Sequence, residues 1–290
     1  YARLSSDSAD GAAMSVYHAP GGVLSVAAGR VAYTYGLQGP ALSVDTACSS
    51  SLVATHLTCQ AIHTQQCTSG LACGVNLTLL PDTTAMFNQA GMLAADGRCK
   101  TLDARADGYV RGEGCAVVGV GGRYNPTEEA HGNSGPAALM VSGTSVNQDG
   151  RSSSLTAPNG PAQQEVIRRA LESSGGMSGL QVGVLQMHGT GTALGDPIEV
   201  GAACAVLTAP QASSKAGGRG MAREEALVLQ AGKVYTGHGE AAAGIVGLLQ
   251  AMQASTHAMH SSLLHLAHIN PHVISAVTHQ GLPGVDHLVG

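Results

Sequence analysis

The sequence contains no tryptophan and a single phenylalanine, so its core has to be built from aliphatic side chains. Charged residues make up only 11% of the 290 residues, and a net charge of −5 leaves no basic stripe of the kind that nucleic-acid-binding proteins carry. No apolar run approaches the roughly 18 residues that a membrane-spanning helix needs. We therefore expect a globular protein that neither binds nucleic acid nor spans a membrane.

A disulfide framework and a zinc ribbon are also not expected, because the seven cysteines form an odd set with irregular gaps and no CxxC pair. This cysteine usage indicates a reducing compartment, either cytoplasmic or organellar. The chain begins with Tyr1, so we expect missing upstream sequence, which could have held a targeting peptide. The last part of the chain is rich in histidine but has no HExxH motif or carboxylate companion, so we interpret these as surface histidines and expect no metal site. They are His257, His260, His265, His268 and His272.

Apolar runs alternate with helical patterns along the chain. The predicted strands are residues 41–45, 115–120, 139–146, 182–187 and 226–230, and the predicted helices are residues 48–62, 161–173, 196–207 and 240–254. This alternation predicts a layered α/β fold with a largely buried sheet. Residues 121–136 and 208–223 are rich in Gly, Ser, Pro and charge, which is typical of surface insertions.

One cysteine lies between a predicted strand and a predicted helix, in the run VDTACSSSL at residues 44–52. Cys48 follows a short turn of small residues and is expected at or near the helix N-terminus. Unpaired backbone N–H groups and the positive end of the helix dipole favour a thiolate there and can help to hold an oxyanion. A thiolate is the reactive nucleophile of cysteine enzymes. The alternative interpretation is a small cysteine packed under a helix, which we assign to the other six.

Two histidines each follow a predicted strand and precede a predicted helix. His188 opens the run HGTGTALGDPIE, in which Thr190 and Thr192 add hydroxyl groups at a strand end, where sites in α/β folds tend to lie. The alternative is a turn histidine with capping threonines. His238 lies in the run KVYTGHGEAAAG, which begins at Lys233.

The segment GHGEAA at residues 237–242 also fits a dinucleotide-binding fingerprint. That fingerprint requires an acidic residue about 20 positions further on. The only acidic residue after Glu240 is Asp286, so we reject nucleotide binding.

The three runs together resemble the active-site motifs of β-ketoacyl synthases, most closely those of polyketide synthase ketosynthase domains. Supporting stretches occur in the same order along the chain, from about residue 1 to residue 271. They are GRCKT at 97–101, ADGYVRGEG at 106–114, NQDGR at 147–151 and LTAPNG at 155–160. The resemblance implies a thiolase-like αβαβα fold. Its N-terminal half would occupy roughly residues 1–122 and its C-terminal half, with both histidines, roughly residues 137–290.

The resemblance also implies a reaction and its partners. Cys48 would accept an acyl group from a thioester on an acyl carrier protein, and a malonyl-type extender would then lose CO2 and attack the Cys48 thioester. His188 and His238 would aim N–H donors at the developing negative charge, and Lys233 would tune the electrostatics of the site. Thr190 and Thr192 would bind the phosphopantetheine arm of the carrier protein. The domain itself would bind no cofactor and would form a homodimer beside other synthase domains.

The chain departs from the family pattern in ways that leave alternatives open. Residues 234–238 read VYTGH where many polyketide members carry SNIGH, and TGH is closer to some fatty acid synthases, so both pathways stay open. The first strands of the fold and a C-terminal GFGGTNAH segment are not found, so we expect a partial sequence that is incomplete at both ends and does not fold independently. A non-elongating homologue, a scaffold without catalysis and a Cys/His hydrolase are the competing functions.

Overall fold

The structure is a computed structural model that describes residues 16–122, 139–209 and 226–278. Its helices are α2 His18–Gly22, α3 Ser25–Tyr35, α4 Ser50–His63, α5 Pro81–Gln89, α6 Gly160–Ser173, α7 Gly195–Leu207, α8 Lys233–Thr236, α9 Ala243–His257 and α10 Pro271–Thr278. Its strands are β1 Ser69–Asn76, β2 Gly114–Gly121, β3 Val184–Gln186 and β4 Val228–Gln230. Within the described residues, no helix is long and apolar enough to cross a membrane.

The first sheet is an antiparallel ladder of β1 and β2, in register from Ser69 opposite Gly121 to Asn76 opposite Gly114. Its inner face packs against α4 and α9. On the outer face of the ladder, Leu71, Val75 and Val117 each stay about half exposed, at 50–52%. The prediction of a largely buried sheet is therefore wrong for β1 and β2, because the described elements cover only one face of this ladder.

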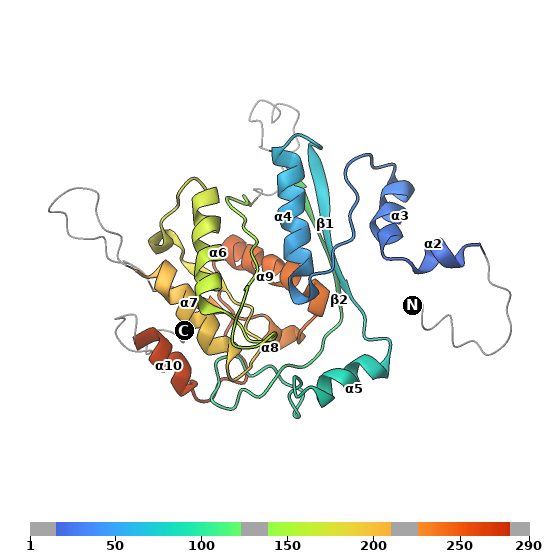
Figure 1. Cartoon of the computed structure of the whole chain (residues 1–290). Helices are drawn as coiled ribbons and strands as arrows, with labels where there is room; N and C mark the ends of the chain where they lie inside the picture. The colour runs from blue at the N-terminus through green and yellow to red at the C-terminus, as the bar shows by residue number, and fades with distance from the viewer. Residues whose placement is uncertain (1–15, 123–138, 210–225, 279–290) are drawn as a thin grey trace.

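The second sheet is a parallel pair, β3 and β4, and it belongs to the main hydrophobic core. Helix α7 lies against this core with α6 and α10 packed on it (Figure 1). The core side chains are aliphatic or small, as the lack of aromatic residues predicts. They are Leu102, Met187, Val200, Ala203, Cys204, Leu207, Leu227, Leu229, Ala231, Val273 and Val277.

Helices α4 and α9 lie together beside the β1–β2 ladder, and α9 also packs against β3 of the second sheet (Figure 1). The hydroxyl of Ser51 in α4 accepts a hydrogen bond of 3.0 Å from the backbone N–H of Ile245 in α9. Glycine allows the close approach, because a Cβ atom on Gly244 would lie 2.6 Å from Cγ of Leu52. This contact places the start of α4, which follows Cys48, beside the start of α9, which follows His238.

The predicted helices all form, within a few residues of their expected bounds. Helix 161–173 is α6, helix 196–207 is α7, helix 48–62 is the 3₁₀ turn Ala47–Ser49 followed by α4, and helix 240–254 is the 3₁₀ turn Glu240–Ala242 followed by α9. A proline near the start of α6 supports its beginning, and Asn159 caps it by accepting from the N–H of Ala162 at 3.2 Å.

The strand predictions were less accurate. Strands 115–120, 182–187 and 226–230 correspond to β2, β3 and β4, but residues 41–45 and 139–146 are not strands. These two segments join no ladder among the described residues, and an apolar run becomes a strand only when a neighbour pairs with it. The sequence patterns did not indicate β1, α2, α3, α5, α8 or α10. The two expected insertions lie mostly outside the described residues.

Candidate active site

Cys48 lies in the 3₁₀ turn Ala47–Ser49, directly before α4. The hydroxyl of Ser50 braces this turn, because it accepts from the N–H of Thr46 at 2.9 Å and donates to the carbonyl of Ala47 at 2.6 Å. The residue before the cysteine, Ala47, has a φ of +54°, a left-handed conformation that costs a residue with a side chain about 1–3 kcal/mol. The turn therefore places Cys48 before the N-terminus of a helix, as the sequence predicts.

His188 begins the loop that follows β3, and a half-buried carboxylate holds the loop in place. Glu199 in α7 accepts hydrogen bonds from the backbone N–H groups of His188 at 2.5 Å and Gly189 at 2.9 Å. Burial raises the pKa of Glu199, although these two hydrogen bonds and Lys233 oppose that shift. The next turn of the loop is held by Asp196, which accepts from the N–H of Gly191 at 3.2 Å.

His238 follows α8 and is buried, with 5% of its surface exposed. Its ring lies edge-on to Tyr109, with the ring centroids 4.9 Å apart. Its Nδ1 atom accepts a hydrogen bond of 3.0 Å from the backbone N–H of Glu240. Because Nδ1 is the acceptor, the neutral ring carries its proton on Nε2, and Nε2–H is its donor.

Lys233 is buried beside His188. Its Nζ donates to the backbone carbonyl of His188 at 2.6 Å and lies 3.4 Å from Nδ1 of the His188 ring. Because the ammonium group of Lys233 can only donate a hydrogen bond, Nδ1 of His188 must be the acceptor. The neutral His188 ring therefore carries its proton on Nε2. Burial lowers the pKa of Lys233, and the neighbouring Glu199 opposes that shift by stabilising the ammonium.

The structure brings Cys48, His188 and His238 together, although they are far apart in the sequence. One ligand-type atom of each residue lies within 4.8 Å of the other two, and the two imidazole rings are edge-on with centroids 5.4 Å apart. This spacing alone would also suit a metal ion. The tautomer of His238 argues against that use, because a ring with its proton on Nε2 has no lone pair there for a metal, and its Nδ1 is occupied.

Both imidazoles are neutral near neutral pH. Burial lowers the pKa of His238 to about 4, with a smaller contribution from the cation of Lys233. His188 is more exposed than His238, and its pKa is also lowered, first by desolvation and then by Lys233 and His238. Two neutral rings with Nε2–H donors beside a thiol form a site that can stabilise an oxyanion.

Thr190 and Thr192 both lie in the loop after His188 and are half-buried. Their hydroxyl oxygens are 3.4 Å apart, and that of Thr192 also accepts from the N–H of Gly195 at the start of α7. One of the two hydroxyls therefore helps to begin a helix, which is the alternative that the sequence left open. Binding of a phosphopantetheine arm by Thr190 and Thr192 stays a prediction.

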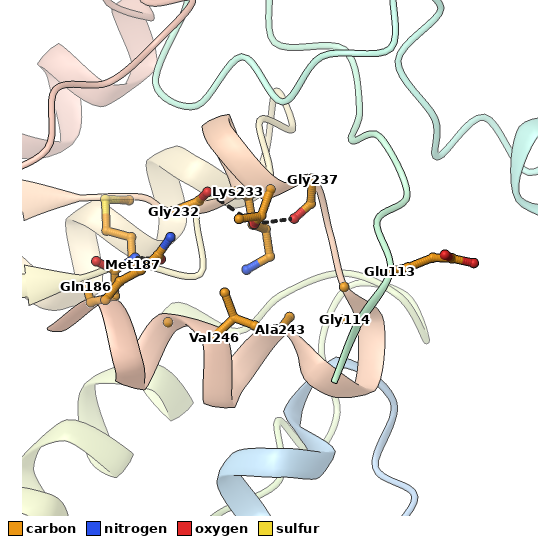
Figure 2. Close-up of a pocket in the computed structure, with 13 residues that line it drawn as sticks. Glu113, Gly114, Gln186, Met187, Gly232, Lys233, Gly237, Ala243 and Val246 are labelled. Carbon is orange, nitrogen blue, oxygen red and sulfur yellow. Dashed lines mark hydrogen bonds between the residues drawn. The ribbon is translucent and has the colours of Figure 1, made fainter. Parts of the chain in front are cut away.

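A pocket adjoins the site on the side of Lys233 (Figure 2). It is bounded by the first turns of α9, the end of β3 and the start of β2, and its lining includes Lys233 but not Cys48, His188 or His238. Figure 2 shows Lys233 facing α9 from across this pocket, whereas Glu113 points away from it. The pocket therefore meets the site through Lys233, which contacts His188.

Several residues that hold the site were not assigned a role from the sequence. They are Tyr109, Arg111, Asp196, Glu199 and Glu240. Each occurs inside one of the sequence runs quoted above, so its position within a motif could have pointed to it. Their roles depend on contacts with distant parts of the chain, which spacing along the sequence does not show.

Comparison with known proteins identifies the family. The β-ketoacyl synthase N-terminal domain matches residues 1–121, and the β-ketoacyl synthase C-terminal domain matches residues 139–267. Erythronolide synthase EryA2 of Saccharopolyspora erythraea is 43% identical over 257 residues, which is 89% of this chain and 7% of that protein. Polyketide synthase GfsA of Streptomyces halstedii is 43% identical over 253 residues, which is 87% of this chain and 3% of that protein.

Solved structures agree with these matches. The ketosynthase domain OzmH KS7 of oxazolomycin biosynthesis from Streptomyces albus has a TM-score of 0.75 at 34% identity, over 87% of this chain and 41% of that chain. The ketosynthase from module 6 of the Bacillus subtilis bacillaene synthase has a TM-score of 0.74 at 32% identity, over 90% of this chain and 44% of that chain. The chain thus spans less than half of the solved chains that it matches. These likenesses confirm the predicted thiolase-like fold class, and the chain belongs to the β-ketoacyl synthase family, with ketosynthase domains of polyketide synthases as its relatives.

Proposed function

We propose that this chain is the condensing part of a polyketide synthase, a transferase that extends an acyl chain by decarboxylative Claisen condensation. The observation that carries this proposal is the convergence of Cys48, His188 and His238 within 4.8 Å. One thiol nucleophile and two neutral N–H donors are what the two stages of such a reaction require.

In the first stage, the Cys48 thiolate attacks the carbonyl carbon of an acyl thioester delivered by an acyl carrier protein. The carbon–sulfur bond to the carrier breaks, and the carrier thiolate takes up the proton that the Cys48 thiol gave up when it became the thiolate. The acyl group then remains on Cys48 as a new thioester. The braced turn before α4 supports this role, because it fixes the backbone on both sides of the nucleophile.

In the second stage, a malonyl-type thioester loses CO2, and the electrons of the broken C–C bond form an enolate. The Nε2–H groups of His188 and His238 donate to the enolate oxygen, and removal of one such donor typically costs about 3 kcal/mol of transition-state stabilisation. The enolate carbon attacks the Cys48 thioester, and the Cys48 thiolate leaves. The product is a β-ketoacyl chain on the carrier protein.

Lys233 orients His188 in this scheme through its two contacts with that residue. Thr190 and Thr192 would bind the phosphopantetheine arm, which belongs to the carrier protein and brings in both substrates. The further partners that we propose are a second copy of the chain in a homodimer and the other domains of a modular synthase. The matches to polyketide synthases support this pathway over fatty acid synthesis.

The competing hydrolase function is not supported by the geometry. In a Cys/His hydrolase, a carboxylate or a side-chain amide orients the basic histidine. Among the described residues, Nδ1 of His188 faces Lys233 and Nδ1 of His238 faces the backbone N–H of Glu240, so neither ring is oriented by a carboxylate or a side-chain amide. A scaffold without catalysis gives no reason for the three side chains to converge.

The test is intact-protein mass spectrometry after incubation with a short acyl-pantetheine thioester, followed by malonyl-pantetheine. We expect an acyl-sized gain in mass that is absent from Cys48→Ala, and a β-ketoacyl product after the malonyl addition. Folded wild-type protein that gains no acyl group would overturn the proposal. An acylated wild type that makes no extended product would instead support a non-elongating homologue.

A further inference from the structure

The backbone around His238 is held from both sides by the segment that contains Arg111. The N–H of His238 donates to the carbonyl of Val110 at 2.7 Å, and the N–H of Gly112 donates to the carbonyl of His238 at 2.9 Å. Arg111 and His238 thus form an isolated parallel bridge between segments far apart in the sequence. This bridge fixes the main chain of His238 but leaves the orientation of its ring to other contacts.

The ring of His238 depends on Glu240. The N–H of Glu240 donates to Nδ1 of the ring at 3.0 Å, and this bond is what places the ring proton on Nε2. Glu240 itself has a φ of +41°, in the left-handed region that a residue with a side chain rarely adopts. Such a conformation persists only when its surroundings hold it there.

The side chain of Glu240 is held by Arg111. Nε of Arg111 donates to Oε1 at 2.6 Å and Nη2 donates to Oε2 at 3.3 Å, which is a two-point contact. The Arg111 side chain is only 8% exposed, and residues of α5 lie against it. In α5, Thr84 accepts from Nη1 at 2.7 Å, and the ring centroid of Phe87 lies 5.4 Å from the guanidinium carbon.

We propose that Arg111 is a positioning residue for His238. It acts through Glu240. Arg111 binds the carboxylate of Glu240, and this contact holds the backbone of Glu240 in the conformation whose N–H donates to Nδ1 and so keeps the His238 proton on Nε2. The inference rests on the proposed function, in which His238 serves the decarboxylation and Cys48 alone accepts the acyl group. A planar guanidinium can bind both oxygens of the Glu240 carboxylate, whereas the ammonium group of a lysine is a single point charge, which explains why an arginine is found here.

This role makes a prediction that an ordinary stabilising ion pair does not make. Loss of the contact between Arg111 and Glu240 should slow decarboxylation, which needs His238, and spare acylation, which needs Cys48. If the ion pair only stabilised the fold, its loss would lower the rates of both steps in proportion to the loss of folded protein. Comparing the two steps in the same sample therefore separates the two explanations.

The experiment compares wild type, Arg111→Met, Arg111→Lys and Glu240→Gln. Acylation of Cys48 by an acyl-pantetheine thioester is followed by intact mass, release of CO2 from malonyl-pantetheine is followed in parallel, and folding is followed by thermal denaturation. We expect Arg111→Met to lower CO2 release about 10–100-fold, as a misplaced catalytic group does, while acylation stays within about twofold. Arg111→Lys and Glu240→Gln, which each retain part of the contact, should fall in between. The matched control is Arg169→Met, which removes an arginine from an exposed pair with Glu165 and should match wild type.

The inference is overturned if Arg111→Met releases CO2 at the wild-type rate, or if both steps fall equally. Should Arg111→Met not fold, the comparison rests on Glu240→Gln, which keeps an acceptor for the guanidinium. Equal rates of CO2 release in Glu240→Gln and wild type would then contradict the positioning role of Arg111. A wild type that neither loads nor decarboxylates would count against the proposed function itself and would remove the basis of the inference as well.

Discussion

The side chain of Lys233 is joined to His188 at two points, the backbone carbonyl at 2.6 Å and the ring Nδ1 at 3.4 Å. The lysine therefore fixes both the main chain and the ring of a residue that lies 45 positions away in the sequence. Its charge also makes the site less favourable for an imidazolium, since it lowers the pKa of both His188 and His238.

Replacement of Lys233 by methionine should slow the decarboxylation and shift its pH dependence. Without the lysine, the His188 ring loses its orienting donor, so we expect CO2 release to fall about 10–100-fold. Removal of the cation also raises the pKa of both His188 and His238 towards their ordinary value, so the acid limb of the pH–rate profile should move to higher pH. A profile that falls in rate without moving on the pH axis would contradict the electrostatic role of Lys233.

The wild-type protein should decarboxylate malonyl-pantetheine at a nearly constant rate from about pH 8 down to pH 6, because both imidazoles are neutral there. Acidification protonates His238, whose pKa is about 4, and the rate should then fall. The unfolded chain has ordinary histidines and binds protons near pH 6.5, so the histidines should make the free energy of unfolding decrease as the pH drops from about 6.5 to 4. CO2 release and urea denaturation across this range measure the two effects. His238→Gln, which cannot titrate, should show a weaker dependence of stability on pH.

Ala47, with its positive φ, should respond in opposite ways to glycine and valine. Ala47→Gly relieves the left-handed conformation and should leave the free energy of unfolding unchanged or raise it by up to about 1 kcal/mol. Ala47→Val places a β-branched side chain there and should cost about 1–3 kcal/mol. Denaturant unfolding measures both variants, and the rate of alkylation of Cys48 by iodoacetamide reports whether the turn has moved. Equal stability of the two variants would show that the turn adopts another backbone conformation.

The hydroxyl of Thr190 should contribute to binding of substrates that carry a full pantetheine arm. One hydrogen bond contributes about 0.5–1.5 kcal/mol, so Thr190→Val should raise the KM for an acyl-pantetheine thioester about 2–10-fold. An N-acetylcysteamine thioester lacks most of the arm and serves as the matched control. Its KM should change little, and an equal rise for both substrates would indicate that the valine disturbs the loop rather than the arm.

Much of the site could be predicted from the sequence, because Cys48, His188, His238 and Lys233 lie in runs that resemble a known family. Their convergence follows from that resemblance and not from any spacing along the chain. The contact between Arg111 and Glu240 spans 129 positions, and neither residue has a local pattern that reveals it. Such long-range polar contacts can be seen only once the fold has brought their segments together.

The fold was predicted well where local signals are strong. Helix α6 has a proline at its start and an asparagine cap, and its predicted start, residue 161, lies next to the observed Gly160. Strand β1 reads SGLACGVN, whose small residues give little alternation of apolar and polar side chains, and it was missed. The opposite error occurred at residues 41–45, where an apolar run suggested a strand that has no pairing partner among the described residues.

The glycine contact between α9 and α4 bears on the exchange of parts between related synthases. A Cβ atom on Gly244 would meet Leu52, and one on Gly74 would meet both Ser51 and Ile245 at 2.8 Å. The segment that carries Cys48 and the segment that carries His238 therefore pack so closely that one added carbon at either glycine would force them apart. A chimera that joins halves from two different parents keeps the spacing of the site only if both parents have glycine at these two positions.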